Sequence, residues 1–122
     1  MILVTGGTGL AGSHLLLELT SEGKRVRALR RKSSKTDFVN HVFNTYANDP
    51  EKQLALIDWV EGDVLDVFSL EDAMEGVNQV YHNAAVVSFR PGDRDLMNKV
   101  NVGGTANVVN AAIEKVLKNY VI

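Results

Sequence analysis

The sequence predicts an α/β protein in which a doubly wound parallel sheet is flanked by helices. Short apolar segments alternate with amphipathic ones along the 122 residues, a pattern typical of parallel strands joined by helical crossovers. The glycine-rich stretch Thr5-Gly6-Gly7-Thr8-Gly9-Leu10-Ala11-Gly12 directly follows the first apolar run and opens the first helical pattern. We expect about five strands in the order 3-2-1-4-5 within one domain over 1–122, with the sheet incomplete at its last strand.

Hydrophobic periodicity and turn residues define the elements. The expected strands are 1–5, 25–30, 57–60, 80–82 and the beginning of a fifth at 120–122. The expected helices are 10–22, one starting within 33–38, a turn at 51–56, 69–74 and a long helix over roughly 94–117. Gly23 stands where a left-handed residue commonly ends a helix, and Gly76 is expected to end the helix whose N-cap is Ser69. Before the third strand, one helical face is expected to combine Phe38, Val42, Phe43 and Tyr46.

The unusual residue clusters lie where the expected strands end. They occupy 6–12, 30–32, 62–64 and 83–85. A doubly wound parallel sheet binds its ligands outside the carboxyl ends of its strands. Because four clusters share this position, the sequence predicts a ligand-binding site at that edge of the sheet.

Composition narrows the classes of partner. The formal net charge is −2, so no overall charge favours nucleic acid or an anionic membrane. The sequence contains no cysteine, which excludes disulfides and thiolate metal sites, and the histidines do not suggest a metal site. No stretch approaches about 18 consecutive apolar residues, and the N-terminus lacks the pattern of a signal peptide. A cytoplasmic protein is therefore expected.

The spacing of Gly6, Gly9 and Gly12 predicts a phosphate cradle. A helix N-terminus offers unpaired N–H groups and about half a positive charge, which a pyrophosphate can use where no Cβ blocks its approach. Gly6 then permits the tight turn, Gly9 the close approach and Gly12 the packing of helix on strand. The hydroxyl of Thr8 adds a donor. The alternative is a turn that needs glycine only to reverse the chain.

Four stretches, in order, carry a family resemblance: TGGTGLAGSHL at 5–15, EGDVLD at 61–66, VYHNAAVVSF at 80–89 and NVGGTANVVNAA at 101–112. On these motifs the chain resembles the extended short-chain dehydrogenase/reductase family of NAD(P)-dependent epimerases and dehydratases. Within this family it is similar to the dihydroflavonol-4-reductase-like branch. The resemblance implies a Rossmann-like fold and a dinucleotide cofactor.

The resemblance also implies roles for residues that follow the third and fourth strands. Asp63 and Val64 would hold the adenine edge, since a carboxylate can accept a bond from the exocyclic amine. An Asx turn is the alternative for Asp63. The residues at 83–85 would let the ribose and nicotinamide lie against backbone, although tight packing also explains two alanines. Asn101 would organise water near the nicotinamide, or bond only to a neighbouring carbonyl. In full, the expected cofactor-binding residues are Gly6, Thr8, Gly9, Leu10, Gly12, Arg30, Arg31, Asp63, Val64, Asn83, Ala84, Ala85 and Asn101.

Cations at the end of the second strand favour NADP over NAD. Arg30, Arg31 and Lys32 stand there, with Lys35 nearby and no carboxylate before Asp37. An acidic residue at this place binds the ribose 2′-OH of NAD, whereas arginine accommodates the 2′-phosphate of NADP. The alternative is that these residues are solvated charges at a strand end.

No catalytic residue is expected in this chain. The family's chemistry depends on a Tyr-x-x-x-Lys pair, and none of the three tyrosines has a lysine four places on. His82, at the end of the fourth strand, is expected to be a packed, hydrogen-bonded residue. The simplest interpretation is that the sequence is the N-terminal part of a longer enzyme.

Two functions from different classes remain open. The first is the dinucleotide-binding portion of an NADP-dependent reductase, epimerase or dehydratase that acts on a small carbonyl or sugar-nucleotide substrate. The alternative is a non-catalytic NAD(P)-binding module that senses redox state or serves a partner protein. An unfinished sheet edge invites self-association, so a homo-oligomer is a further expectation.

Overall fold

In the computed structural model of the chain, which describes residues 1–83 and 99–115, four parallel strands form one sheet with helices on both faces. The strands are β1 (Ile2–Thr5), β2 (Val26–Arg30), β3 (Ile57–Glu61) and β4 (Gln79–His82). Their order is β3-β2-β1-β4, and each neighbouring pair is parallel. The predicted doubly wound α/β fold is confirmed, and the fifth strand expected at 120–122 lies outside the described residues.

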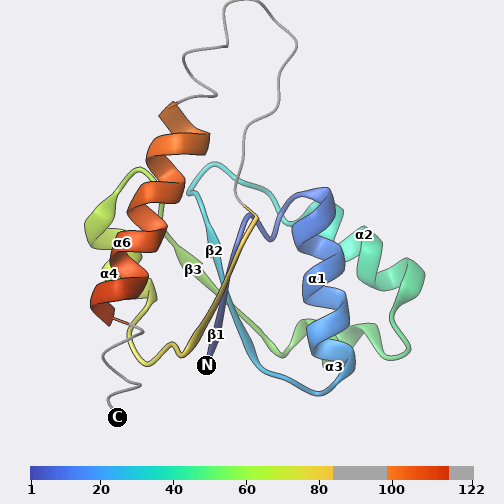
Figure 1. The fold of residues 1–122 in the computed structure, drawn as a ribbon. Helices are drawn as coiled ribbons and strands as arrows, with labels where there is room; N and C mark the ends of the chain where they lie inside the picture. The colour runs from blue at the N-terminus through green and yellow to red at the C-terminus, as the bar shows by residue number, and fades with distance from the viewer. Residues whose placement is uncertain (84–98, 116–122) are drawn as a thin grey trace, which may run out of the picture.

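The helices divide between the two faces of the sheet (Figure 1). One face is covered by α1 (Leu10–Ser21), α2 (Asp37–Tyr46) and α3 (Pro50–Leu54). The other is covered by α4 (Val67–Ala73) and α6 (Thr105–Lys115), and a π-helical segment, η2 (Lys99–Gly104), leads into α6. None of the helices in the described part of the chain is long and apolar enough to cross a bilayer. Because the strands are parallel, their carboxyl ends meet at one edge, which we call the carboxyl edge.

Side-chain alternation along β1 divides the apolar core into two layers. Leu3 and Val4 are both fully buried, and each belongs to a different hydrophobic cluster. The cluster around Leu3 includes Val64, Leu70, Met74 and Val108, under α4 and α6, and the cluster around Val4 includes Leu16, Val26, Val39 and Phe43, under α1 and α2. Burial of each such side chain stabilises the fold by about 1.5–3 kcal/mol. The strand that carries the glycine-rich turn is thus the central, fully covered strand.

The predicted face of the helix before β3 is partly wrong. Val42 and Phe43 are buried, but Phe38 is 41% exposed and Tyr46 is 64% exposed. Val39 takes the place expected for Phe38, because the face that packs towards α1 runs through positions 39, 42 and 43. Tyr46 instead contacts the ring of His14, with ring centroids 5.6 Å apart.

The N-cap of α4 is Asp66, so the prediction of Ser69 as the cap is wrong. The helix begins two residues before Ser69, and Asp66 Oδ1 accepts hydrogen bonds from the backbone N–H groups of Phe68 and Ser69. The hydroxyl of Ser69 instead accepts a bond from the N–H of Asp63, at 3.0 Å. The helix ends at Ala73, three residues before the expected Gly76, which has φ +74° and lies in the left-handed region.

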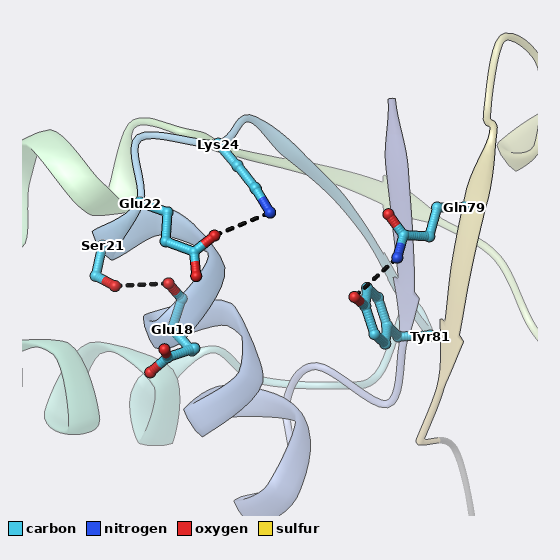
Figure 2. Close-up of polar contacts among 6 residues, drawn as sticks. All are labelled: Glu18, Ser21, Glu22, Lys24, Gln79 and Tyr81. Atoms are coloured by element: carbon cyan, nitrogen blue, oxygen red, sulfur yellow. Dashed lines mark hydrogen bonds and ion pairs between the residues drawn. The ribbon is translucent and has the colours of Figure 1, made fainter.

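Polar contacts at the opposite end of the strands serve local structure. Gly23 ends α1 with φ +78°, which confirms its predicted role. The next residue, Lys24, places Nζ 2.9 Å from the Glu22 carboxylate, whose hydrogen bond raises the pKa of Lys24. Figure 2 shows this pair together with the Gln79–Tyr81 contact on β4, where Nε2 donates to Oη at 2.9 Å. The two charged side chains are about half exposed, at 51% and 49%, so their pairing contributes little to stability.

Candidate functional site

The glycine-rich turn begins directly at the carboxyl end of β1. Gly6 has φ +68°, a conformation that side chains with a Cβ rarely adopt. The N–H of Gly9 donates to the carbonyl oxygen of Gly6 at 3.2 Å, and Ser13 N–H donates to the carbonyl oxygen of Gly9 at 2.9 Å. The chain therefore reverses at Gly6 and enters α1 at Gly9, as the sequence predicts for the turn.

Packing within the protein explains the glycine at position 12. A Cβ on Gly12 would overlap the carbonyl oxygen of Gly6 and lie 2.6 Å from its carbonyl carbon and 2.8 Å from Gly7 Cα. Backbone atoms cannot move aside cheaply. The first turn of α1 therefore approaches the glycine-rich turn so closely that only glycine fits, and Gly12 packs against this turn rather than against the strand, where the sequence predicts it.

No such contact explains the glycine at position 9. A Cβ there would come no closer than 3.6 Å, to the Gly6 carbonyl oxygen, which is an ordinary contact, and its φ of −88° suits any residue. Gly9 is exposed, and so is Leu10, at 68%. Gly9 is also the N-cap of α1, which has no capping side chain and no acidic residue in its first turn. The turn therefore presents helix N–H groups across open space, and that space is suited to an anion.

At the end of β4, a series of hydrogen bonds connects β1, β4 and α6. The N–H of Asn83 donates to both the carbonyl oxygen and the hydroxyl oxygen of Thr5, at 3.1 Å each. Thr5 Oγ1 lies 2.7 Å from His82 Nδ1, and His82 Nε2 lies 3.0 Å from Thr105 Oγ1 on α6. His82 is thus a partly buried, hydrogen-bonded residue, as predicted. Ala84 and Ala85 lie outside the described residues.

Burial lowers the pKa of His82 below its ordinary value of 6.5. The unfolded chain therefore binds this proton at a higher pH than the folded chain does. Neutral His82 therefore stabilises the folded chain relative to protonated His82. This part of the free energy of unfolding is fully present above pH about 6.5 and is lost as the pH falls through the folded-state pKa. We expect His82→Gln to reduce the loss of stability between pH about 7.5 and about 5, measured by urea unfolding. The exposed control His41→Gln is expected to leave that loss unchanged, and an equal effect of both variants would contradict the assignment.

The turn after β3 is held in place by side chains from two helices. Asp63 Oδ1 accepts the N–H of Leu65 at 2.9 Å, which is the Asx turn considered from the sequence. This bond engages one carboxylate oxygen, so the Asx turn and the predicted adenine contact are compatible. Val64 is buried, and its carbonyl oxygen accepts a bond from Asn107 Nδ2 at 2.9 Å. Asn107, like Ser69, was not among the residues predicted for the site.

Asn101 lies in η2 and is partly buried. The sequence predicts one α-helical face through Asn101, Thr105, Val108 and Ala112. Val108 is buried and Ala112 packs against the core, but Thr105 is exposed, so the prediction is wrong there. The face shifts because η2 is π-helical, and a π-helix bonds over five residues rather than four. Gly104, the last residue of η2 before α6 begins, is buried.

A cluster of basic residues lies at the end of β2, at the carboxyl edge: Arg30, Arg31, Lys32 and Lys35. Arg30 is partly buried and its Nη1 lies 3.4 Å from the carbonyl oxygen of Ser34. Ser34 N–H in turn donates to the carbonyl oxygen of Arg31 at 2.9 Å, which forms a tight turn. The side chains of Arg31, Lys32 and Lys35 are exposed. Three exposed cationic side chains therefore follow β2, with their charge available to a ligand.

Comparison with known proteins assigns the family. The model of the NAD dependent epimerase/dehydratase family matches residues 2–122. A putative dihydroflavonol 4-reductase of Synechocystis is 37% identical over 109 residues, which are 89% of this chain and 28% of that protein. Sterol demethylase protein B of Methylococcus capsulatus is 36% identical over 110 residues, which are 90% of this chain and 30% of that protein.

A solved structure agrees with these relatives. A short-chain dehydrogenase/reductase superfamily protein from Agrobacterium tumefaciens, crystallised with bound NAD, superposes with a TM-score of 0.68 and 34% identity. The match covers 92% of this chain and 28% of that one. The chain thus spans less than a third of the length of each of these three proteins. Because the family model covers nearly the whole sequence, the predicted resemblance is confirmed, and the chain belongs to the NAD-dependent epimerase/dehydratase family.

Proposed function

We propose that this chain is the dinucleotide-binding portion of an NADP-dependent oxidoreductase of the reductase, epimerase or dehydratase type. The observation that carries the proposal is the contrast between two glycines of one turn. Gly12 is needed to pack α1, whereas a Cβ on Gly9 would meet nothing closer than 3.6 Å. A glycine that the protein itself does not require is best explained by a ligand that approaches its backbone.

The four strand ends suggest how a dinucleotide lies along the carboxyl edge. The pyrophosphate would accept N–H groups at the start of α1, near Gly6, Thr8, Gly9, Leu10 and Gly12. The adenosine half would extend towards β2 and β3, and the nicotinamide half towards β4 and η2. The candidates for the adenosine half are Arg30, Arg31, Asp63 and Val64, and those for the nicotinamide half are Asn83, Ala84, Ala85 and Asn101. When bound, the nicotinamide supplies hydride transfer, and this chain's residues hold and orient it.

The preference for NADP rests on the cations after β2. Arg31 is exposed and follows the last residue of that strand, where the adenosine ribose of a bound dinucleotide would lie. Guanidinium groups bind a phosphate through paired hydrogen bonds, whereas a ribose hydroxyl does not need them. The similar Agrobacterium protein was crystallised with NAD, which lacks the 2′-phosphate. The preference of this chain for NADP therefore needs its own binding experiment.

We expect Arg31→Asp to weaken NADPH binding by about tenfold or more, because a carboxylate repels the 2′-phosphate. The same carboxylate can accept a hydrogen bond from the ribose 2′-OH of NADH. NADH binding is expected to stay the same or tighten. Both affinities are measured by titration calorimetry. The matched control is Arg25→Asp, which makes the same charge change at an exposed position before the amino end of β2. Equal affinities of the unmodified chain for NADPH and NADH would refute the arginine assignment.

We propose that the reaction is catalysed by a longer protein of which this chain is one part. We propose a small carbonyl or sugar-nucleotide substrate, in line with the reductases and epimerases to which the chain is similar. The test is oxidation of NADPH, or epimerisation without net oxidation, across a panel of both substrate classes. Tight dinucleotide binding without any turnover by the full protein would instead favour a non-catalytic NAD(P)-binding module.

A further inference from the structure

We propose that Asn107 is a positioning residue that sets the adenine preference of the site by orienting the Asp63 carboxylate. The inference rests on the proposed function. It concerns a side chain on α6 that lies 43 residues from its partner, the carbonyl group of Val64.

A single peptide unit links the two residues. Asn107 Nδ2 donates to the carbonyl oxygen of Val64 at 2.9 Å. The N–H on the other side of that same peptide bond belongs to Leu65, and it donates to Asp63 Oδ1 at 2.9 Å. The peptide unit is planar and stiff, so its C=O and N–H point in opposite, fixed directions. Asn107 therefore fixes the carbonyl side of this peptide plane, and the N–H side of the same plane fixes the Asp63 carboxylate.

Close packing from the end of η2, which leads into α6, supports the same point. A Cβ on Gly104 would lie 2.7 Å from Val64 Cγ2, so the helix backbone approaches the turn as closely as a glycine allows. Gly104 is the last residue of η2 and lies three residues before Asn107 in the chain. Val64 is thus approached at its side chain by Gly104 of η2 and bonded at its carbonyl oxygen by Asn107 of α6.

The other hydrogen bonds of residues 63–66 are local to the turn or come from α4. Asp66 N–H donates to the carbonyl oxygen of Asp63 at 2.9 Å, and Asp63 N–H donates to Ser69 Oγ at 3.0 Å. These bonds shape the turn, but neither of them engages the C=O of Val64 or the N–H of Leu65, so neither fixes the Val64–Leu65 peptide plane directly. The amide of Asn107 supplies that restraint, because a carbonyl group that loses its donor is free to tilt towards solvent and to carry the linked N–H with it.

The test compares adenine with hypoxanthine in the dinucleotide. Hypoxanthine carries a carbonyl group where adenine has its exocyclic amine, so a fixed carboxylate discriminates between the two. The probes are NADPH and reduced nicotinamide hypoxanthine dinucleotide phosphate, titrated calorimetrically. We expect the unmodified chain to prefer the adenine form by about tenfold. Asn107→Leu should lose most of that preference, through weaker NADPH binding and nearly unchanged binding of the hypoxanthine form.

Two further variants separate positioning from folding. Asn110→Leu makes the same change at an exposed position of α6 and should keep the preference. Asn107→Asp keeps the shape of the side chain but has no donor when ionised, so it should lose the preference even where the leucine variant fails to fold. Equal weakening of both ligands by Asn107→Asp, or a retained preference, overturns the inference. If the unmodified chain binds neither dinucleotide, the proposed function fails. If it binds both equally, only the pairing of Asp63 with adenine and the role of Asn107 fail.

Discussion

Gly9→Val is expected to lower the affinity for NADPH by about a hundredfold or more while the fold stays intact. The backbone at Gly9 has φ −88°, and its Cβ would lie 3.6 Å from the nearest atom outside its neighbours. The Cβ of a valine therefore meets no clash, and its two methyl groups are expected to occupy the space in front of the first N–H groups of α1. A pyrophosphate could no longer approach those groups. Titration calorimetry gives the affinity, and thermal unfolding checks the fold.

The control for this variant is Ala55→Val, which places a valine at an exposed position with ordinary helical backbone angles, just after α3 and before the amino end of β3. It is expected to bind NADPH almost as the unmodified chain does. Unchanged binding by a folded Gly9→Val protein would show that the turn serves chain reversal only.

Gly12→Ala is expected to produce the opposite result, a loss of stability of about 3 kcal/mol or more. Its added methyl group would overlap the carbonyl group of Gly6, and the helix could relieve the clash only by moving away from the turn. Urea unfolding measures the change. Gly9→Ala is the matched control, since it adds the same atom to the same turn and is expected to cost about 1 kcal/mol or less. Similar losses in both variants would contradict the division of roles between the two glycines.

Much of the fold could be predicted because the signals are local. Alternating apolar segments identified four strands and the helices between them, and right-handed crossovers then permit few strand orders. The turn at Gly6 and the helix end at Gly23 followed from the same reasoning, since each requires a positive φ, which the structure confirms. The site was placed at the carboxyl edge because parallel strands bring separate loops together there.

The features that sequence reasoning missed depend on contacts between distant elements. Asn107 has no local signature, because its partner is the carbonyl group of Val64 and any residue at position 64 provides one. Serine favours the N-cap position, which predicts Ser69 as the cap, but Asp66 caps the helix earlier in the chain and leaves the serine hydroxyl to bond with Asp63. The face of α2 shifted to Val39 because packing on α1, rather than residue size, selects the buried side. Periodicity alone also gave no sign of the π-helical segment before α6.

The most direct test of the central claim, that a nicotinamide dinucleotide binds at the carboxyl edge with its pyrophosphate over the glycine-rich turn, is amide-resolved NMR of the labelled chain titrated with NADPH. We predict large shifts for the amides of residues 6–12 and smaller ones for 30–31, 63–64 and 83, at the four strand ends. Amides at the opposite edge, such as those of Lys24 and Gln79, should not move. Saturating NADPH that leaves residues 6–12 unshifted, or that shifts only the opposite edge, would contradict the claim.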